Sequence, residues 1–150
     1  MSSAVELASR WRRLAAAVID AVLVPALSFF LVMITGTVED AEDFVDATWM
    51  LHVLLLAIAA YLLLNGVLLW RRGQTIGKAL LGIAVHAVAD PSQPAPFWKL
   101  VALRAWFFAL LFVVVVPWFA LLPLVDQLLI FRNNRRCLHD LVAGTIVVRK

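Results

Sequence analysis

Long apolar runs with few polar positions dominate the chain. Residues 14–34 contain two polar positions, Asp20 and Ser28, and residues 50–70 contain three. A helix needs about 20 residues to cross roughly 30 Å of hydrocarbon, so we predict transmembrane helices over 14–34 and 50–70. The first run is longer than the apolar core of a signal peptide, roughly 7–15 residues, and Asp20 interrupts it. We therefore expect it to be retained.

A third apolar region, 97–131, is too long for one straight span, since at roughly 1.5 Å per residue it would measure about 52 Å. Pro117 and Pro123 interrupt it, and proline removes a backbone donor and clashes with the preceding turn. We predict a span at 98–116, followed by a short span or re-entrant helix at 118–131. The alternative is a single kinked span, which gives three spans in all.

The positions of the charged residues favour the split. Lys and Arg beside membrane segments favour the cytoplasmic side, and basic clusters lie at 10–13, 71–78 and 132–136. These clusters can share one side only if the third apolar region enters the membrane and returns. The acidic loop 35–48 then lies outside, and both chain termini are cytoplasmic. The lipid bilayer and its anionic headgroups, rather than nucleic acid, are the expected partners of the basic clusters.

Composition supports a membrane-embedded chain. Hydrophobic residues make up 64% and charged residues 15%, against roughly 45–50% and 25% in soluble proteins. Residues 82–88 and the C-terminal "GTIVVRK" form two short runs that favour a small β-ribbon. Isolated ribbons are marginal, so this one would lean on the helices. The predicted fold is a single domain, residues 1–150: an all-α integral membrane protein with about four transmembrane or re-entrant helices and a small cytoplasmic β-ribbon.

Four charges fall within or beside the apolar segments: Arg13, Asp20, Arg104 and Asp126. A charge at the bilayer centre costs about 2.5–3.5 kcal/mol on insertion scales, so such residues usually face the bundle interior and pair with one another. We expect a charged layer near the cytoplasmic side, to which Lys78 and Asp140 are candidate additions. The layer either fixes the packing of the helices or forms an ion or proton path, and the sequence does not separate the two.

The stretch "RRCLHD" carries reactive residue types close together. Cys137 and His139 are two positions apart, so they point in different directions on a regular helix or strand, which argues against a catalytic pair. Zinc usually takes four ligands, and with Asp140 only three are local. We expect no metal site and no enzymatic activity. Arg136 would instead anchor to lipid headgroups, while His139 and Asp140 bond nearby groups or a base, or Asp140 caps the following turn.

The segment "RRGQTIGKA" is one residue short of phosphate-loop spacing. Ala79 also occupies the position where the magnesium-binding hydroxyl belongs, so we expect neither a nucleotide nor another cofactor.

Four motifs occur in order along the chain: "RRLAAAVID", "GQTIGKALLGIAV", an arginine opening the third span, and "RRCLHDLVAGTIVV". Together they resemble the RDD family of small bacterial membrane proteins, named for one arginine and two aspartates. The resemblance assigns the arginine to Arg13 and one aspartate to Asp20, while Asp126 and Asp140 both stand at family-like positions for the other. It also implies a multi-pass protein of the bacterial inner membrane. Asn133 and Asn134 replace an acid that many members carry there.

Two functions follow as hypotheses. The resemblance suggests transport, so the first is a small transporter or ion/proton-exchange subunit that uses the buried Arg/Asp layer. Because four short helices enclose a narrow interior, we expect a homo-oligomer or a membrane-complex partner. The second is a non-catalytic accessory or scaffold subunit that presents a basic cytoplasmic face to partners or anionic lipids.

Overall fold

The computed structural model describes residues 6–39, 47–103, 125–126, 128–133 and 136–150. These described residues are mostly helical and include one two-stranded sheet. Its elements, in chain order, are α1 (Arg10–Ile34), α2 (Ala47–Arg72), α3 (Ile76–Leu80), β1 (Ile83–Ala87), the π-helix η1 (Lys99–Leu103), the 3-10 helix η3 (Leu129–Phe131), α6 (Leu138–Ala143) and β2 (Thr145–Arg149).

The two long helices match the first two predicted spans and extend slightly beyond them. The side chain of Ser9 accepts a hydrogen bond from the backbone N–H of Arg12 and caps α1. Both helices are long and apolar enough to cross a membrane. Their apolar side chains remain largely exposed; Phe29 on α1 and Leu63 on α2 are 66% and 73% exposed. This exposure distinguishes them from core helices of a soluble protein and leaves an apolar surface for lipid.

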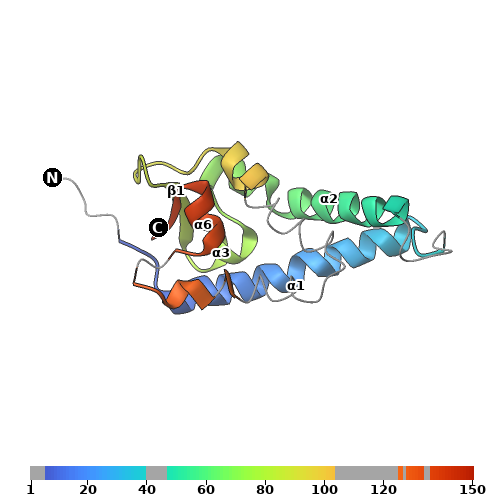
Figure 1. Cartoon of the computed structure of the whole chain (residues 1–150), viewed down its shortest axis with the longest axis horizontal. Coiled ribbons are helices and arrows are strands. Elements are labelled where there is room, and N and C mark those ends of the chain that lie inside the picture. Colours follow the sequence, from blue (N-terminus) through green and yellow to red (C-terminus); the bar gives the residue numbers. More distant parts are fainter. Residues whose placement is uncertain (1–5, 40–46, 104–124, 127, 134–135) are drawn as a thin grey trace.

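Figure 1 shows how the elements are arranged. Helices α1 and α2 run antiparallel as a long hairpin, while α3, β1 and α6 gather at one end, beside the N-terminal part of α1. The polar contacts described below lie in this gathered end.

The predicted ribbon is present, and both of its outer edges make backbone hydrogen bonds to other segments. Strands β1 and β2 pair antiparallel, with Ile83 opposite Arg149 and Ala87 opposite Thr145. On the far edge of β2, the backbone N–H of Ala8 donates to the carbonyl of Val147. On the far edge of β1, the N–H of Ala95 donates to the carbonyl of Val85. These contacts supply the support that a two-stranded ribbon needs.

A small hydrophobic core joins the ribbon to the helices. Residues from the ribbon, from α1 and α2, from η1 and from the segments beside the strands are buried together: Ala8, Ala16, Leu69, Ile83, Val85, Ala95, Leu100 and Val147. The ribbon therefore packs against the ends of the helices, which supplies the stability that an isolated two-stranded ribbon lacks.

The third apolar region is described only near its two ends. Leu100 of η1 lies in the core cluster, and the ring of Phe131 in η3 meets that of Trp11 edge-on at 6.1 Å. Both ends thus lie at the ribbon end of the molecule, as a chain that leaves and returns would require. Most of the predicted spans 98–116 and 118–131 falls in 104–124, outside the described residues, so the count of four segments stays a prediction.

Candidate functional site

The C-terminal motif forms a short helix with a side-chain cap. Cys137, in an extended conformation, is the N-cap of α6, and Asp140 completes a capping box by accepting a hydrogen bond from the N–H of Cys137 at 3.3 Å. Gly144 ends the helix in the left-handed conformation, with φ of 62°, which glycine adopts without steric cost. Asp140 therefore caps the first turn of α6, the helix to which it belongs, whereas the sequence suggested the turn that follows it.

Asp140 also joins α6 to the first turn of α1. Its Oδ2 lies 2.5 Å from Nη2 of Arg13, and both side chains are buried. Its Oδ1 accepts a hydrogen bond from the hydroxyl of Thr145 at 3.2 Å. Breaking a buried ion pair typically costs about 3–5 kcal/mol, because one charge loses its partner. This pair therefore fixes the C-terminal motif against the start of the membrane hairpin.

A second buried carboxylate holds the neighbouring histidine. Asp126 accepts hydrogen bonds from both the backbone N–H of His139, at 3.0 Å, and its ring Nδ1, at 2.5 Å. The other ring nitrogen, Nε2, lies 3.5 Å from Oδ1 of Asp140. The imidazole is thus placed between two carboxylates, and all three side chains are buried.

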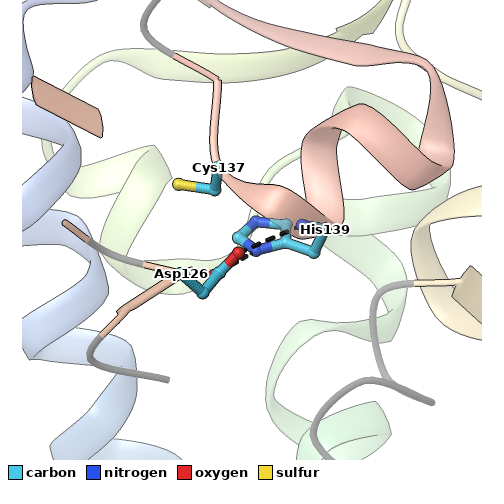
Figure 2. A group of neighbouring side chains, drawn as sticks. All are labelled: Asp126, Cys137 and His139. Carbon is cyan, nitrogen blue, oxygen red and sulfur yellow. Dashed lines mark hydrogen bonds and ion pairs between the residues drawn. The ribbon is translucent and has the colours of Figure 1, made fainter. Parts of the chain in front are cut away.

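Cys137 completes a compact group with Asp126 and His139. One ligand atom from each residue lies within 4.8 Å of those of the other two. Figure 2 shows Asp126 and His139 pointing toward each other, with Cys137 beside them at the start of α6. The expectation that Cys137 and His139 diverge is therefore wrong. It holds only for helical spacing, since residues two positions apart on a strand share a face. Here Cys137 is extended at the cap and His139 already lies in the helix.

A separate polar junction surrounds Asp20 of α1. Its Oδ2 accepts a hydrogen bond from the hydroxyl of Thr75 at 2.5 Å, and its Oδ1 accepts one from the backbone N–H of Gly77 at 2.8 Å. The ammonium nitrogen of Lys78 lies 3.6 Å from Oδ2. Because Thr75 is the N-cap of α3, Asp20 ties α3 directly to the first membrane helix.

Helix α2 contributes to the same junction. The side-chain oxygen of Asn65 accepts a hydrogen bond from the N–H of Ile76 at 2.8 Å, and the hydroxyl of Thr75 accepts one from the N–H of Lys78 at 3.4 Å. The first N–H groups of a helix lack acceptors within the helix. In α3 the N–H groups of Ile76, Gly77 and Lys78 each donate to a side-chain oxygen. Those acceptors come from α2, α1 and the cap itself.

A family model decides the classification. The RDD family model matches residues 7–144, which run from the segment before α1 to Gly144 at the end of α6. The chain belongs to the RDD family. Comparison with curated proteins and with solved structures gave no significant match. Family membership and the two long apolar helices together indicate that this RDD protein is a membrane protein.

The described residues cover only part of the single charged layer that the sequence suggested for the RDD protein, so the layer stays a prediction. Arg13, Asp20 and Asp126 bind Asp140, the α3 junction and His139 respectively, and within the described part of the chain they do not pair with one another. Arg13 and Asp20 lie on the same helix, but Arg13 contacts α6 and Asp20 contacts α3. Arg104 lies outside the described residues.

Arg136 of the RDD protein was expected to anchor to lipid headgroups. Its guanidinium donates to backbone carbonyls, with Nε 3.1 Å from the oxygen of Thr145 and Nη2 3.2 Å from that of Asp140. Carbonyls in the last turn of a helix carry partial negative charge and attract cations. The Asp140 oxygen is one of these, while that of Thr145 belongs to β2. Two of the Arg136 donors are thus used inside the fold. Contact with lipid headgroups stays a prediction.

The α3 junction of the RDD protein was only partly visible in the sequence. Lys78 was a candidate, but Thr75, Gly77 and Asn65 were not assigned to the same site. A usable signal was the threonine two positions before the glycine of "TIGK", since Thr is a common N-cap. The approach of Asp126 to Cys137 had no comparable signal, because the two residues lie on different segments.

Proposed function

We propose that this RDD protein is a small transporter or ion/proton-exchange subunit in which Asp20 and Lys78 form the polar site. The supporting observation is the difference in exposure among its acids. The side chain of Asp20 is 18% exposed although it lies within an apolar helix, whereas Asp126 and Asp140 are 1% and 0% exposed. Ionisable residues inside membrane segments commonly mark ion or proton pathways.

The contacts around Asp20 favour exchange of its counter-ion. Neutral donors, the Thr75 hydroxyl and the Gly77 N–H, hold the carboxylate in place. The ammonium of Lys78 neutralises it from 3.6 Å, beyond normal hydrogen-bond distance. Lysine is a point charge on a flexible stem, so an incoming cation competes with it for Oδ2. Binding of a cation and displacement of Lys78 would then leave the local charge balanced.

The test is ion flux in proteoliposomes with several cations, comparing the wild type with Asp20→Asn. Asparagine keeps the side-chain size and an acceptor for Gly77 but removes the charge. We expect flux to fall to background while folded protein still accumulates. Asp90→Asn, at an exposed loop carboxylate, is the matched control and should retain flux. Background flux in wild type and Asp20→Asn alike would contradict transport.

An accessory or scaffold subunit is the alternative. In its favour, Asp20 joins α3 to α1, and exposed arginines flank the helices: Arg12, Arg71, Arg72 and Arg132. Such a basic face suits anionic lipids or an acidic partner. This role predicts that Asp20→Asn mainly lowers the yield of folded protein or the capture of a partner. Size-exclusion chromatography of both variants separates this result from loss of flux.

We propose further that the protein crosses the bacterial inner membrane several times, with both termini in the cytoplasm, and that it functions as a homo-oligomer or with a membrane partner. The basic segments near the ends of α1 and α2 support this orientation. A reporter that is active only in the cytoplasm should give a signal when fused after Lys150, and a reporter that is active only in the periplasm should give none. A periplasmic signal would overturn the orientation and the four-segment topology.

A further inference from the structure

We propose that Asp126, Cys137 and His139 bind a divalent transition-metal ion such as Zn²⁺. Their ligand atoms lie within 4.8 Å of one another, and the residues are all buried. They offer a carboxylate oxygen, a sulfur and an imidazole nitrogen, the donor types that zinc and similar ions take in proteins. Figure 2 shows the three side chains grouped between the start of α6 and the segment that carries Asp126.

Two of the ligands are already held in position. The backbone N–H of His139 donates to Oδ1 of Asp126, and the ring donates to Oδ2. Metal binding would replace the bond between ring and carboxylate by two bonds to the metal. The ring proton would then move from Nδ1 to Nε2, which lies 3.5 Å from Oδ1 of Asp140. The backbone N–H would continue to hold Oδ1 of Asp126, and such outer contacts orient ligands at metal centres.

The surroundings of Cys137 suit a thiolate ligand. Nη2 of Arg13 lies 3.7 Å from its sulfur, and a neighbouring guanidinium stabilises a thiolate. The positive charge of Arg13 is offset by Asp140, with which it is paired. The thiolate of Cys137 and the carboxylate of Asp126 then provide two negative charges for a divalent cation. Coordination would release the thiol proton to solvent, so binding should weaken in acid.

The donor set also indicates which ions the site would reject. Mg²⁺ and Ca²⁺ prefer oxygen ligands, whereas sulfur and nitrogen favour Zn²⁺, Co²⁺ and related ions. Three protein ligands leave a coordination position for water or another ligand. This site does not include Asp20 or Lys78, so the proposal stands apart from the proposed transport and would tie Asp126 to α6 in either case.

The experiment is Co²⁺ binding to the metal-stripped, full-length protein in detergent, after removal of any histidine tag. Cys137 is the one cysteine of the sequence, so a thiolate-to-cobalt charge-transfer band can come from no other residue. We expect one Co²⁺ per chain with this band, displacement by Zn²⁺, and no displacement by Mg²⁺ or Ca²⁺. Wild-type protein without the band, or without binding above a detergent blank, overturns the proposal.

Variants test the other ligands. Cys137→Ser should lose the band, and Asp126→Asn and His139→Asn should each weaken binding more than about tenfold, since even outer-shell changes cost roughly 10–100-fold. His52→Asn, at an exposed histidine near the start of α2, is the matched control and should bind as wild type does. Wild-type affinity in Asp126→Asn or His139→Asn would overturn the assignment. The spectrum of the wild-type protein alone decides whether the site binds metal, so the test still gives an answer if a variant folds poorly.

Discussion

Gly77→Ala should weaken the junction between α3 and α1. An added Cβ at this position would collide with the carbonyl oxygen of Ala16 and would lie 2.9 Å from Oδ1 of Asp20. Relief of this collision requires α3 to move away from α1. The movement would lengthen the hydrogen bond from the Gly77 N–H to Asp20, which is 2.8 Å in the wild type.

The expected loss of stability follows from three effects. Forcing a methyl group into a packed contact costs about 1–3 kcal/mol, and a hydrogen bond to a charged group contributes about 1.5–3 kcal/mol. Alanine returns roughly 0.5–1 kcal/mol by its greater helix propensity. The net destabilisation should be about 2–5 kcal/mol, which corresponds to a fall in the thermal midpoint of roughly 5–15 °C.

Thermal unfolding in detergent, followed by circular dichroism, measures this effect. Gly66→Ala is the matched control, because a Cβ added there meets no atom within 4 Å. It should leave the midpoint unchanged or raise it slightly through helix propensity. If Gly77→Ala unfolded at the same temperature as Gly66→Ala, the close contact between α3 and α1 would be refuted.

Two further predictions concern ionised side chains. Arg13→Gln and Asp140→Asn should each destabilise the fold by about 3–5 kcal/mol, because each single change leaves one buried charge without its partner. The double variant should lose less stability than the sum of the two single losses. A double-mutant cycle from unfolding midpoints measures this, and additive losses would contradict direct pairing. In the exposed loop after β1, hydrogen bonds from the Ser92 hydroxyl and backbone N–H lower the pKa of Asp90. Ser92→Ala should raise that pKa toward its ordinary value in an NMR titration, and an unchanged pKa would show that the hydroxyl has no effect. Since the folded pKa is the depressed one, the stabilisation is present above the unfolded pKa and is lost as the pH falls through the folded value.

The long helices were predictable because their signal is local. An apolar run of sufficient length determines a membrane-spanning helix without reference to the rest of the chain. The start of α1 was predicted less accurately, since Ser9 caps the helix and α1 begins at Arg10, four residues before the predicted start at residue 14. The ribbon was also predictable from its β-branched residues, but its register and its covered edges depend on contacts between distant segments.

The site was less predictable because its contacts join different elements. Arg13 and Asp20 both lie on the first predicted helix, but their partners depend on where α6 and α3 dock. The spacing argument failed at Cys137 and His139 because the helix cap breaks the regular geometry between them. Helical periodicity therefore does not predict the side-chain directions of residues in a motif that spans a helix cap.

The N-terminus of α3 has a consequence for the order of assembly. Its acceptors include Asn65 of α2 and Asp20 of α1, so docking of α3 requires both long helices to be inserted and adjacent. The short helix leads directly into β1, which later pairs with the last strand of the chain. A newly made molecule would therefore complete its ribbon only after the hairpin is correctly placed. An exposed α3 would mark an incompletely assembled protein and offer quality-control proteases an accessible segment.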